Sequence, residues 1–542
     1  MVEQHRGAPA EPILDQDEIQ GNIVPGFSKP HQGVLALTLG DVRGAKDWIR
    51  AVLPKITTLA QCMDSRIKVR EQRGLGEDRL ATLAVATPVD DVWLNVAISR
   101  SGMTKLLAGG AYSADVAAFT DPGFQAGLAA RSALLGDPTD PSAEGNPARW
   151  LFGGPGREAD VLLICGADHD QSGSALLDDV RDHALACGAS VLYEETAHKL
   201  DRIGKEHFGF QDGISQPGVR GRLSADPDSF LTQRVLDPSH TPEVWMYGLP
   251  GQYLVWPGEF VFGYPGTAAD PLIPGAIKLP GPDWSRNGSY LAFRRLRQDV
   301  AAFWGFTTSF AEGLSSRPGF EGISPEWLAS RLVGRWPSGA PLARLPDHDD
   351  EALGVDRLAN NDFGFAVDAT SVPLTGVTGR GNWPEAKADP VGLTCPLAAH
   401  IRKVNARETA NDMGGRHASF DRRILRRGLT FGPALEDPMV DDPVNGNRGL
   451  LFFCYQTSIQ DQFEFLCSAW ANDEKRPRSP SGFDMIIGQN GRPGAGRARS
   501  CTLLGHDAGA ATVVTMTDFV IATGGGYYFS PSMSALEMVL GA

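Results

Sequence analysis

The stretch EHFGFQDGISQP, residues 206–217, carries the most information about this chain. It places one carboxylate, Asp212, after two aromatic residues and between Gly209 and Gly213. Glycine reaches backbone conformations that other residues resist, and it lets other groups approach the backbone closely. An Asp in this setting is typical of a functional site, although a bare Gly-x-x-Asp-Gly in a chain with 63 glycines is more often a turn.

A second segment, TCPLAAHIRKVN at residues 394–405, contains one of the 11 histidines, His400. Proline is well placed in a first helical turn, so Pro396 predicts the start of a short helix. Two small residues, Ala398 and Ala399, would let a flat macrocycle approach the backbone. A lone histidine is more often a locally packed residue than a ligand, so this segment needs support from elsewhere in the chain.

A third segment, RRILRRGLTFGP at residues 422–433, holds four arginines within six positions. Such a cluster is ordinarily a basic surface. The apolar pair Ile424 and Leu425 between the charges indicates that at least one guanidinium turns inward. Periodicity does not choose between Arg426 and Arg427.

Together these segments resemble the motifs of the dye-decolourising peroxidases, a family of haem enzymes. The resemblance runs from residues 17–23 to residues 523–532 and is weakest between about 300 and 390. It implies an α+β fold of two ferredoxin-like domains, with the haem held mainly by the C-terminal half. We therefore expect an N-terminal domain at 1–220 and a C-terminal haem-binding domain at 221–542, with an insertion around 300–390.

The resemblance also implies the site residues. His400 aligns with the proximal iron ligand, so it is the expected metal ligand, and Asp212 and Arg426 align with the distal acid and arginine. Arg427 becomes the neighbour of the distal arginine. The resemblance, and not the periodicity, makes this choice.

Three further residues follow from the same resemblance. Leu450 and Phe452, in the apolar run 449–455, align with a pair that walls the distal pocket. Asp484 aligns with an acid that hydrogen-bonds the proximal histidine, although a turn aspartate before a strand would look the same. A carboxylate of this kind orients an imidazole and raises its basicity.

The function implied is a peroxidase with non-covalent haem b, with hydrogen peroxide and bulky aromatic electron donors as partners. One alternative is a haem-handling protein of the same fold, which needs His400 but not Asp212 and Arg426 together. Another is a hydrolase or isomerase that uses Asp212 and His207 without haem. A Soret band in the purified protein would discriminate between these classes.

Composition limits the partners. The net charge of −15 argues against nucleic acid and anionic membranes, and no apolar run approaches the length of a membrane span. The seven cysteines are scattered, with no Cys-x-x-Cys-His for covalent haem attachment, which together with the polar N-terminus favours a cytoplasmic protein. The acidic stretch 347–351 is expected to be a solvated loop, with a cation site as the alternative. A homo-oligomer is left open.

Apolar periodicity predicts the coarse elements. Strands are expected at 92–98, 259–264, 289–295, 449–455 and 512–521, and helices at 173–186 and near 300–304. Strands and helices in this order, with short connections, are typical of an α+β sandwich.

Overall fold

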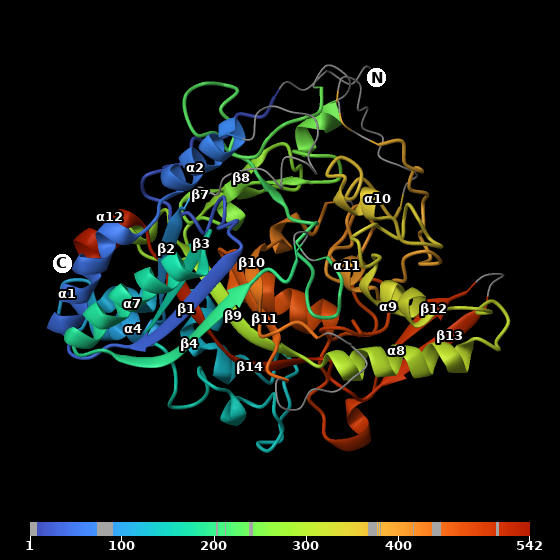
Figure 1. Ribbon diagram of the computed structural model, residues 1–542. Helices are drawn as coiled ribbons and strands as arrows, with labels where there is room; N and C mark the ends of the chain where they lie inside the picture. The colour runs from blue at the N-terminus through green and yellow to red at the C-terminus, as the bar shows by residue number, and fades with distance from the viewer. Residues whose placement is uncertain are drawn as a thin grey trace.

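The structure is a computed structural model, and it describes residues 8–72, 90–201, 204–211, 213–237, 242–366, 377, 379, 381–415, 417–435, 446–505 and 509–542. Eight strands of the described chain form a closed barrel near the centre of the molecule (Figure 1). They are β1 (His31–Thr38), β2 (Val92–Ile98), β3 (Val161–Ala167), β4 (Ser190–His198), β9 (Ser289–Gln298), β10 (Leu425–Phe431), β11 (Gly449–Gln456) and β14 (Val520–Ser530).

The barrel consists of two four-stranded antiparallel sheets, one from each half of the chain. The first has the order β4-β1-β3-β2 and the second the order β14-β9-β11-β10, which is the same ferredoxin-like arrangement twice. Two single-residue pairings close the barrel. They join Ile98 on β2 to Phe529 on β14, and His198 on β4 to Thr430 on β10. The predicted α+β fold with two ferredoxin-like halves is confirmed.

Side-chain alternation gives the second sheet two different faces. On β11, Leu451 and Phe453 are buried in the core enclosed by the barrel, whereas Leu450 and Phe452 point to the opposite face. Successive residues of a strand point to opposite faces of a sheet, so the same backbone both builds the core and presents residues outside it.

Helices cover the outer faces of both sheets. Among the described residues, no helix is long and apolar enough to cross a membrane. The helices are α1 (Val42–Val52), α2 (Leu59–Gln72), α4 (Arg100–Leu106), α5 (Pro122–Ala126), α6 (Leu128–Arg131), α7 (Asp170–Ala186), α8 (Val300–Leu314), α9 (Pro325–Val333), α10 (Glu351–Val355), α11 (His400–Lys403) and α12 (Met533–Ala535), with π-helical segments at Ile459–Glu464, Leu466–Ala471 and Leu536–Leu540.

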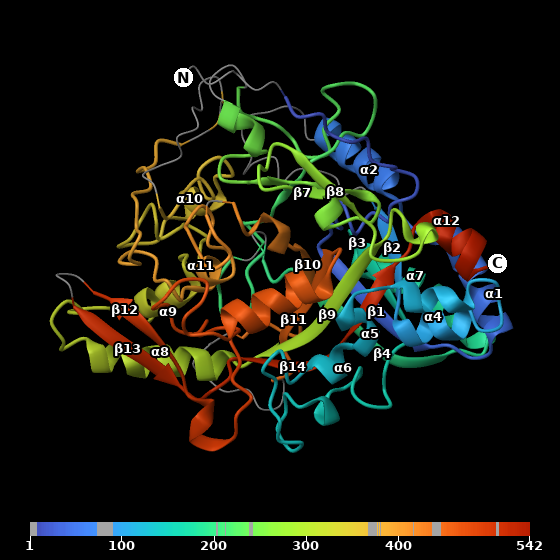
Figure 2. The ribbon, with the colours of Figure 1, turned by 180° about the vertical axis from the view of Figure 1, so that it is seen from behind.

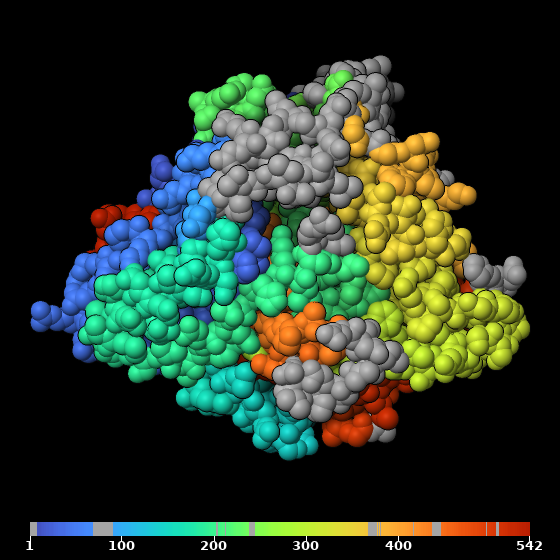
Figure 3. All heavy atoms as spheres, in the orientation of Figure 1, coloured from blue at the N-terminus to red at the C-terminus, as the bar shows by residue number. Residues whose placement is uncertain are grey.

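A separate apolar core lies outside the barrel, beside the second sheet. It joins α8 and α9 to Phe208 and Phe210, and to Ala398 and Ala399 just before α11. Figure 2 shows α8, α9 and the β12–β13 hairpin (Arg499–Leu504 and Ala510–Thr515) together at the side away from α1. In the space-filling view, residues 300–360 form the right-hand face and the first half of the chain forms the left (Figure 3). The remaining short strands are β5 (Gly218–Val219), β6 (Leu254–Val255), β7 (Tyr264–Thr267) and β8 (Pro274–Lys278).

Two strand predictions were wrong. Residues 259–264 do not form a strand, because the amides of Phe260 and Val261 both donate to the Pro257 carbonyl and close a turn before β7. Residues 512–521 form two strands, β13 and β14. The chain turns between them at Asp518, which pairs with Arg497 and Arg499.

Two smaller expectations also changed. The helix expected from Pro396 begins instead at His400, because Ala399 is extended (φ −55, ψ 132) after a turn closed by the Ala399 amide and the Pro396 carbonyl. In the acidic stretch, Asp349 accepts from the Ser338 amide (3.0 Å) and Asp350 caps α10. No group of three metal-binding side chains occurs within the described ranges.

Candidate active site

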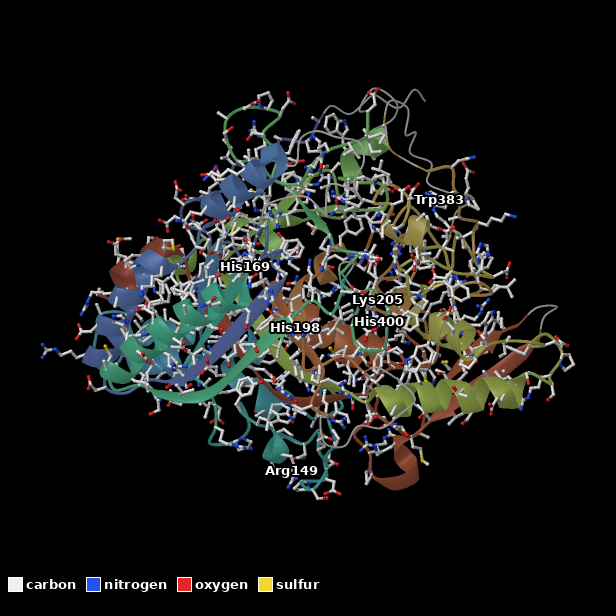
Figure 4. All side chains as sticks on the ribbon, viewed as in Figure 1. Arg149, His169, His198, Lys205, Trp383 and His400 are labelled. Carbon is white, nitrogen blue, oxygen red and sulfur yellow. The ribbon has the colours of Figure 1, made fainter. Side chains whose placement is uncertain are left out.

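A cavity of about 300 Å³ lies on the outer face of the second sheet, a volume within the range of ligand pockets. Its walls come from β9, β10, β11 and β14, from the motif at 206–217, and from α11. His400 lines it and lies toward the middle of the molecule, whereas Trp383 lies toward the periphery (Figure 4). Most of the lining is apolar, so the charged groups that do face the cavity indicate its chemistry.

The turn before His400 is fixed by one buried carboxylate, Asp389. Its two oxygens accept from the backbone amides of residues 392–395 at 2.7–3.1 Å. Arg402 in α11 donates to the Asp389 carbonyl at 2.7 Å and to the Cys395 carbonyl at 2.7 Å. These contacts join α11 to the preceding turn and so determine where His400 enters the cavity.

Asp484 holds the His400 ring from behind the cavity wall. Nδ1 of His400 lies 2.7 Å from Oδ2 of Asp484, and Oδ1 accepts from the amides of Ile486 (2.9 Å) and Ile487 (3.0 Å). Burial pushes the pKa of Asp484 upward, but the charge and hydrogen bond of His400, together with the two amides, outweigh it and leave the pKa below its ordinary value. An ionised carboxylate here makes Nδ1 the protonated ring nitrogen.

Arg426 and Arg427 point to opposite sides of β10. Arg426 lines the cavity, and its Nη2 donates to the Ser215 carbonyl at 3.2 Å. Arg427 donates to the carbonyls of Asn22 (3.0 Å) and Ile23 (2.9 Å), so it anchors the N-terminal segment instead. The alternation of a strand therefore separates two arginines that sequence periodicity could not.

Asp212 lies outside the described residues, but its neighbours are placed. Gly209 and Gly213 have φ angles of 94° and 80°, a region that favours glycine, as the motif suggested. The Gln216 side chain hydrogen-bonds both the amide and the carbonyl of Arg426 at 3.3 Å. The motif thus runs beside β10, where Gly213 and Ser215 line the same cavity as Arg426.

Leu450 and Phe452 also line the cavity, from β11, next to the strand that carries Arg426. Both are half-buried and apolar. They therefore form an apolar part of the wall beside the Arg426 guanidinium.

Four further arginines line the cavity and were not predicted as site residues: Arg294, which pairs with Asp137 at 2.7 Å, and Arg335, Arg407 and Arg423. Among the described residues, Arg335 and Arg407 donate only to carbonyl, amide and hydroxyl oxygens, and Nη2 of Arg423 is buried without a hydrogen-bond partner. Burial and the charge of Arg407 lower the pKa of Arg335 to about 9 and that of Arg423 to about 10. This excess of positive charge favours an anionic ligand.

His207, the base of the non-haem alternative, does not line the cavity. Its ring is buried, and Nε2 lies 2.8 Å from the Phe431 carbonyl. Burial lowers the pKa of His207 to about 4. Because its ring is hydrogen-bonded to a backbone carbonyl and does not face the cavity, His207 has a structural role and is not placed to transfer protons in the cavity.

Comparisons with known proteins find relatives over nearly the whole chain. A family model described as "DyP dimeric alpha+beta barrel domain" matches residues 18–197. The dye-decolorizing peroxidase of Mycena epipterygia is 30% identical over 549 residues, which cover 98% of this chain and 88% of that protein.

Solved structures give the same result. A variant of the dye-decolorizing peroxidase from Pleurotus ostreatus superimposes with a TM-score of 0.73 at 27% identity, covering 98% of this chain and all of the other. A dye-decolorizing peroxidase in complex with 2,6-dimethoxyphenol superimposes with a TM-score of 0.68 at 26% identity, with the same coverage.

Proposed function

Because the chain belongs to the dye-decolourising peroxidase family and is an enzyme of that class, we propose that its cavity binds non-covalent haem b. His400 is the proposed proximal iron ligand. With Nδ1 hydrogen-bonded to Asp484, Nε2 is the ring nitrogen for coordination. The observation that carries this proposal is the His400–Asp484 pair at the wall of a largely apolar cavity.

The charged and apolar side chains that line the cavity fit haem b. Haem b is a flat apolar ring with two carboxylates, and the cavity combines apolar walls with Arg335, Arg407 and Arg423. The buried Nη2 of Arg423 without a partner is the donor that an anionic ligand would satisfy. We propose that these arginines hold the propionates.

The haem would supply the redox chemistry that reduces hydrogen peroxide and oxidises an electron donor. Asp212, beside Gly213 and Ser215 in the motif, would accept a proton from one peroxide oxygen and deliver it to the departing one. Arg426 would stabilise the negative charge that develops as the O–O bond breaks. Asp484 would keep the His400 ring oriented and basic.

Aromatic molecules are the proposed electron donors. A related enzyme binds 2,6-dimethoxyphenol, and in the present cavity Leu450 and Phe452 form part of the wall. We propose that these two side chains keep bulky donors out of the cavity. Bulky dyes would therefore be oxidised from the protein surface. We further propose the division into 1–220 and 221–542, because β1–β4 fall in the first range and β9–β14 in the second.

The test is an absorption spectrum of the purified protein and of two variants. The wild type should show a Soret band, and His400→Ala should lose most haem and activity. His207→Gln is the matched control, since it changes a buried histidine that does not line the cavity, and it should keep both. A His400→Ala variant with a wild-type spectrum and activity would refute the ligand assignment. Haem binding without peroxide turnover would favour the haem-handling alternative.

A further inference from the structure

Lys403, the last residue of α11, has an exposed fraction of 0%. Lysine is rarely buried completely, and a buried ammonium ordinarily pairs with a carboxylate. Within the described part of the chain, the Lys403 ammonium instead donates to neutral oxygens: the carbonyls of Asp473 (2.6 Å) and Arg476, and the hydroxyl of Ser481 (2.8 Å). Burial lowers the pKa of Lys403 to about 8, and the negative charge of Asp484 is the largest influence opposing that shift.

The three acceptors lie on one segment, residues 473–481, which leads directly to Asp484. Hydrogen bonds from the Ser481 amide (3.2 Å) and the Gly482 amide (2.7 Å) to the Glu474 carbonyl close this segment into a loop. The Asp484 amide then donates to the Ala471 carbonyl at 3.0 Å. Lys403 is therefore bonded to both ends and the middle of the loop that precedes Asp484.

His400 stands at the opposite end of α11 from Lys403. It is the first residue of α11 and Lys403 is the last, so a single helical turn separates them. The chain returns to Asp484 only after 84 residues, so the His400–Asp484 contact depends on tertiary bonds between α11 and the loop. Lys403 makes three such bonds.

We propose that Lys403 is a positioning residue for the His400–Asp484 pair, holding α11 against the 473–481 loop so that Nδ1 of His400 stays hydrogen-bonded to Asp484. This inference rests on the proposed role of His400 as iron ligand. Lys403 acts through the pair, since it is not among the residues that line the cavity.

The test compares Lys403→Met with wild type as reduced holoenzymes, by resonance Raman spectroscopy of the iron–histidine stretch. Methionine has a similar length and no donor. We expect the band to shift to lower frequency and broaden, because a loosened Asp484 hydrogen bond lowers the basicity of the imidazole. Transfer of haem to apomyoglobin should become at least about tenfold faster.

Lys29→Met is the matched control. Lys29 is also buried, but it pairs with Asp168 at 2.6 Å and lies over the Trp93 ring, in the first half of the chain. This variant should lower the unfolding temperature and leave the iron–histidine band unchanged. If Lys403→Met behaves in the same way, Lys403 is only structural and the proposal is overturned.

Two further measurements keep the test decisive. Ser481→Ala removes a single acceptor, so it remains informative if Lys403→Met does not fold. It should shift the band less but in the same direction, and an unshifted band would count against the proposal.

A wild type without any iron–histidine band would overturn the proposed function instead. Hydrogen exchange at the Ile486 and Ile487 amides, which donate to Asp484, then tests Lys403 directly: faster exchange in Lys403→Met supports the proposal and unchanged exchange overturns it.

Discussion

His400 and Asp484 are separated by 84 residues in sequence, and yet Nδ1 of one lies 2.7 Å from Oδ2 of the other. The aspartate is fully buried and accepts from two backbone amides as well. A carboxylate held in this way fixes the rotation of the imidazole and its tautomer before any ligand binds. The contact therefore orients the His400 ring at the cavity wall without the help of a bound ligand.

Replacing Asp484 with Asn should preserve the shape of this contact and remove its charge. Less electron density on the imidazole should weaken haem binding or peroxide turnover by about 10–100-fold. Haem transfer to apomyoglobin and steady-state peroxide kinetics measure the two effects. Asp160→Asn is the control, because Asp160 is equally buried but pairs with Lys105 in the first half of the chain. Wild-type values in Asp484→Asn would exclude a role for the carboxylate charge.

Substitutions of the two adjacent arginines of β10 should have different effects, one on catalysis and the other on stability. Arg426→Leu should slow the peroxide step by about 10²–10³-fold, because it removes a charged donor from the cavity wall. Arg427→Leu should leave that rate intact but destabilise the fold by about 1–3 kcal/mol for each buried carbonyl left without a donor. Rapid-mixing spectroscopy and denaturant unfolding measure the two quantities. A slower peroxide step in Arg427→Leu, together with a loss of stability in Arg426→Leu, would show that the two arginines have the reverse roles.

Arg423→Met should have opposite effects on the protein with and without haem. The buried guanidinium has an unsatisfied Nη2 and lies near Arg407, so its removal should leave the haem-free protein equally or more stable. The same change should weaken haem binding if the guanidinium holds a propionate. Unfolding of the haem-free protein and titration with haem test the two halves. Loss of stability with unchanged haem affinity would assign Arg423 a structural role.

Much of the fold could be predicted from the sequence because its signals are local. Apolar runs identified β2 at 92–98 and most of β11, since both strands are largely buried. The barrel closure could not be predicted in this way. It depends on Ile98 pairing with Phe529 and His198 pairing with Thr430, contacts between distant segments that leave no pattern in either.

The candidate site shows the same contrast between local sequence motifs and contacts that form only between distant segments. His400 and Arg426 stand in compact motifs, and the resemblance of those motifs to a family supplied their expected roles. Arg423 stands in the same segment as Arg426, but Arg335 and Arg407 meet it at the cavity only because separate segments come together there, so no spacing in the sequence connects the three. Lys403 lies inside a quoted motif, but its partners at 473–481 became visible only in three dimensions.

His207 should make the protein less stable in acid. Burial lowers its pKa to about 4, against about 6.5 in the unfolded chain, so the unfolded state binds more protons between these values. Stability should therefore fall as the pH falls through that window, by on the order of 3 kcal/mol. His207→Gln keeps a donor for the Phe431 carbonyl and should flatten this part of the stability–pH curve. Equal slopes in both proteins would remove His207 as the cause.

Dye oxidation should nevertheless be fastest at acid pH, for two separable reasons. A distal carboxylate such as Asp212, with an ordinary pKa of about 3.9, still accepts protons at a pH where a histidine base of about 6.5 is already protonated. The chain also carries −15 at pH 7, and protonating surface carboxylates relaxes its repulsion of anionic dyes. If the surface charge alone is responsible, a neutral phenol will show no acid preference, whereas a requirement for the distal carboxylate will appear with every donor. Asp212→Asn should abolish the common component and slow the peroxide step by about 10²–10⁴-fold. A rate profile for an anionic dye that peaks above neutrality would refute both causes.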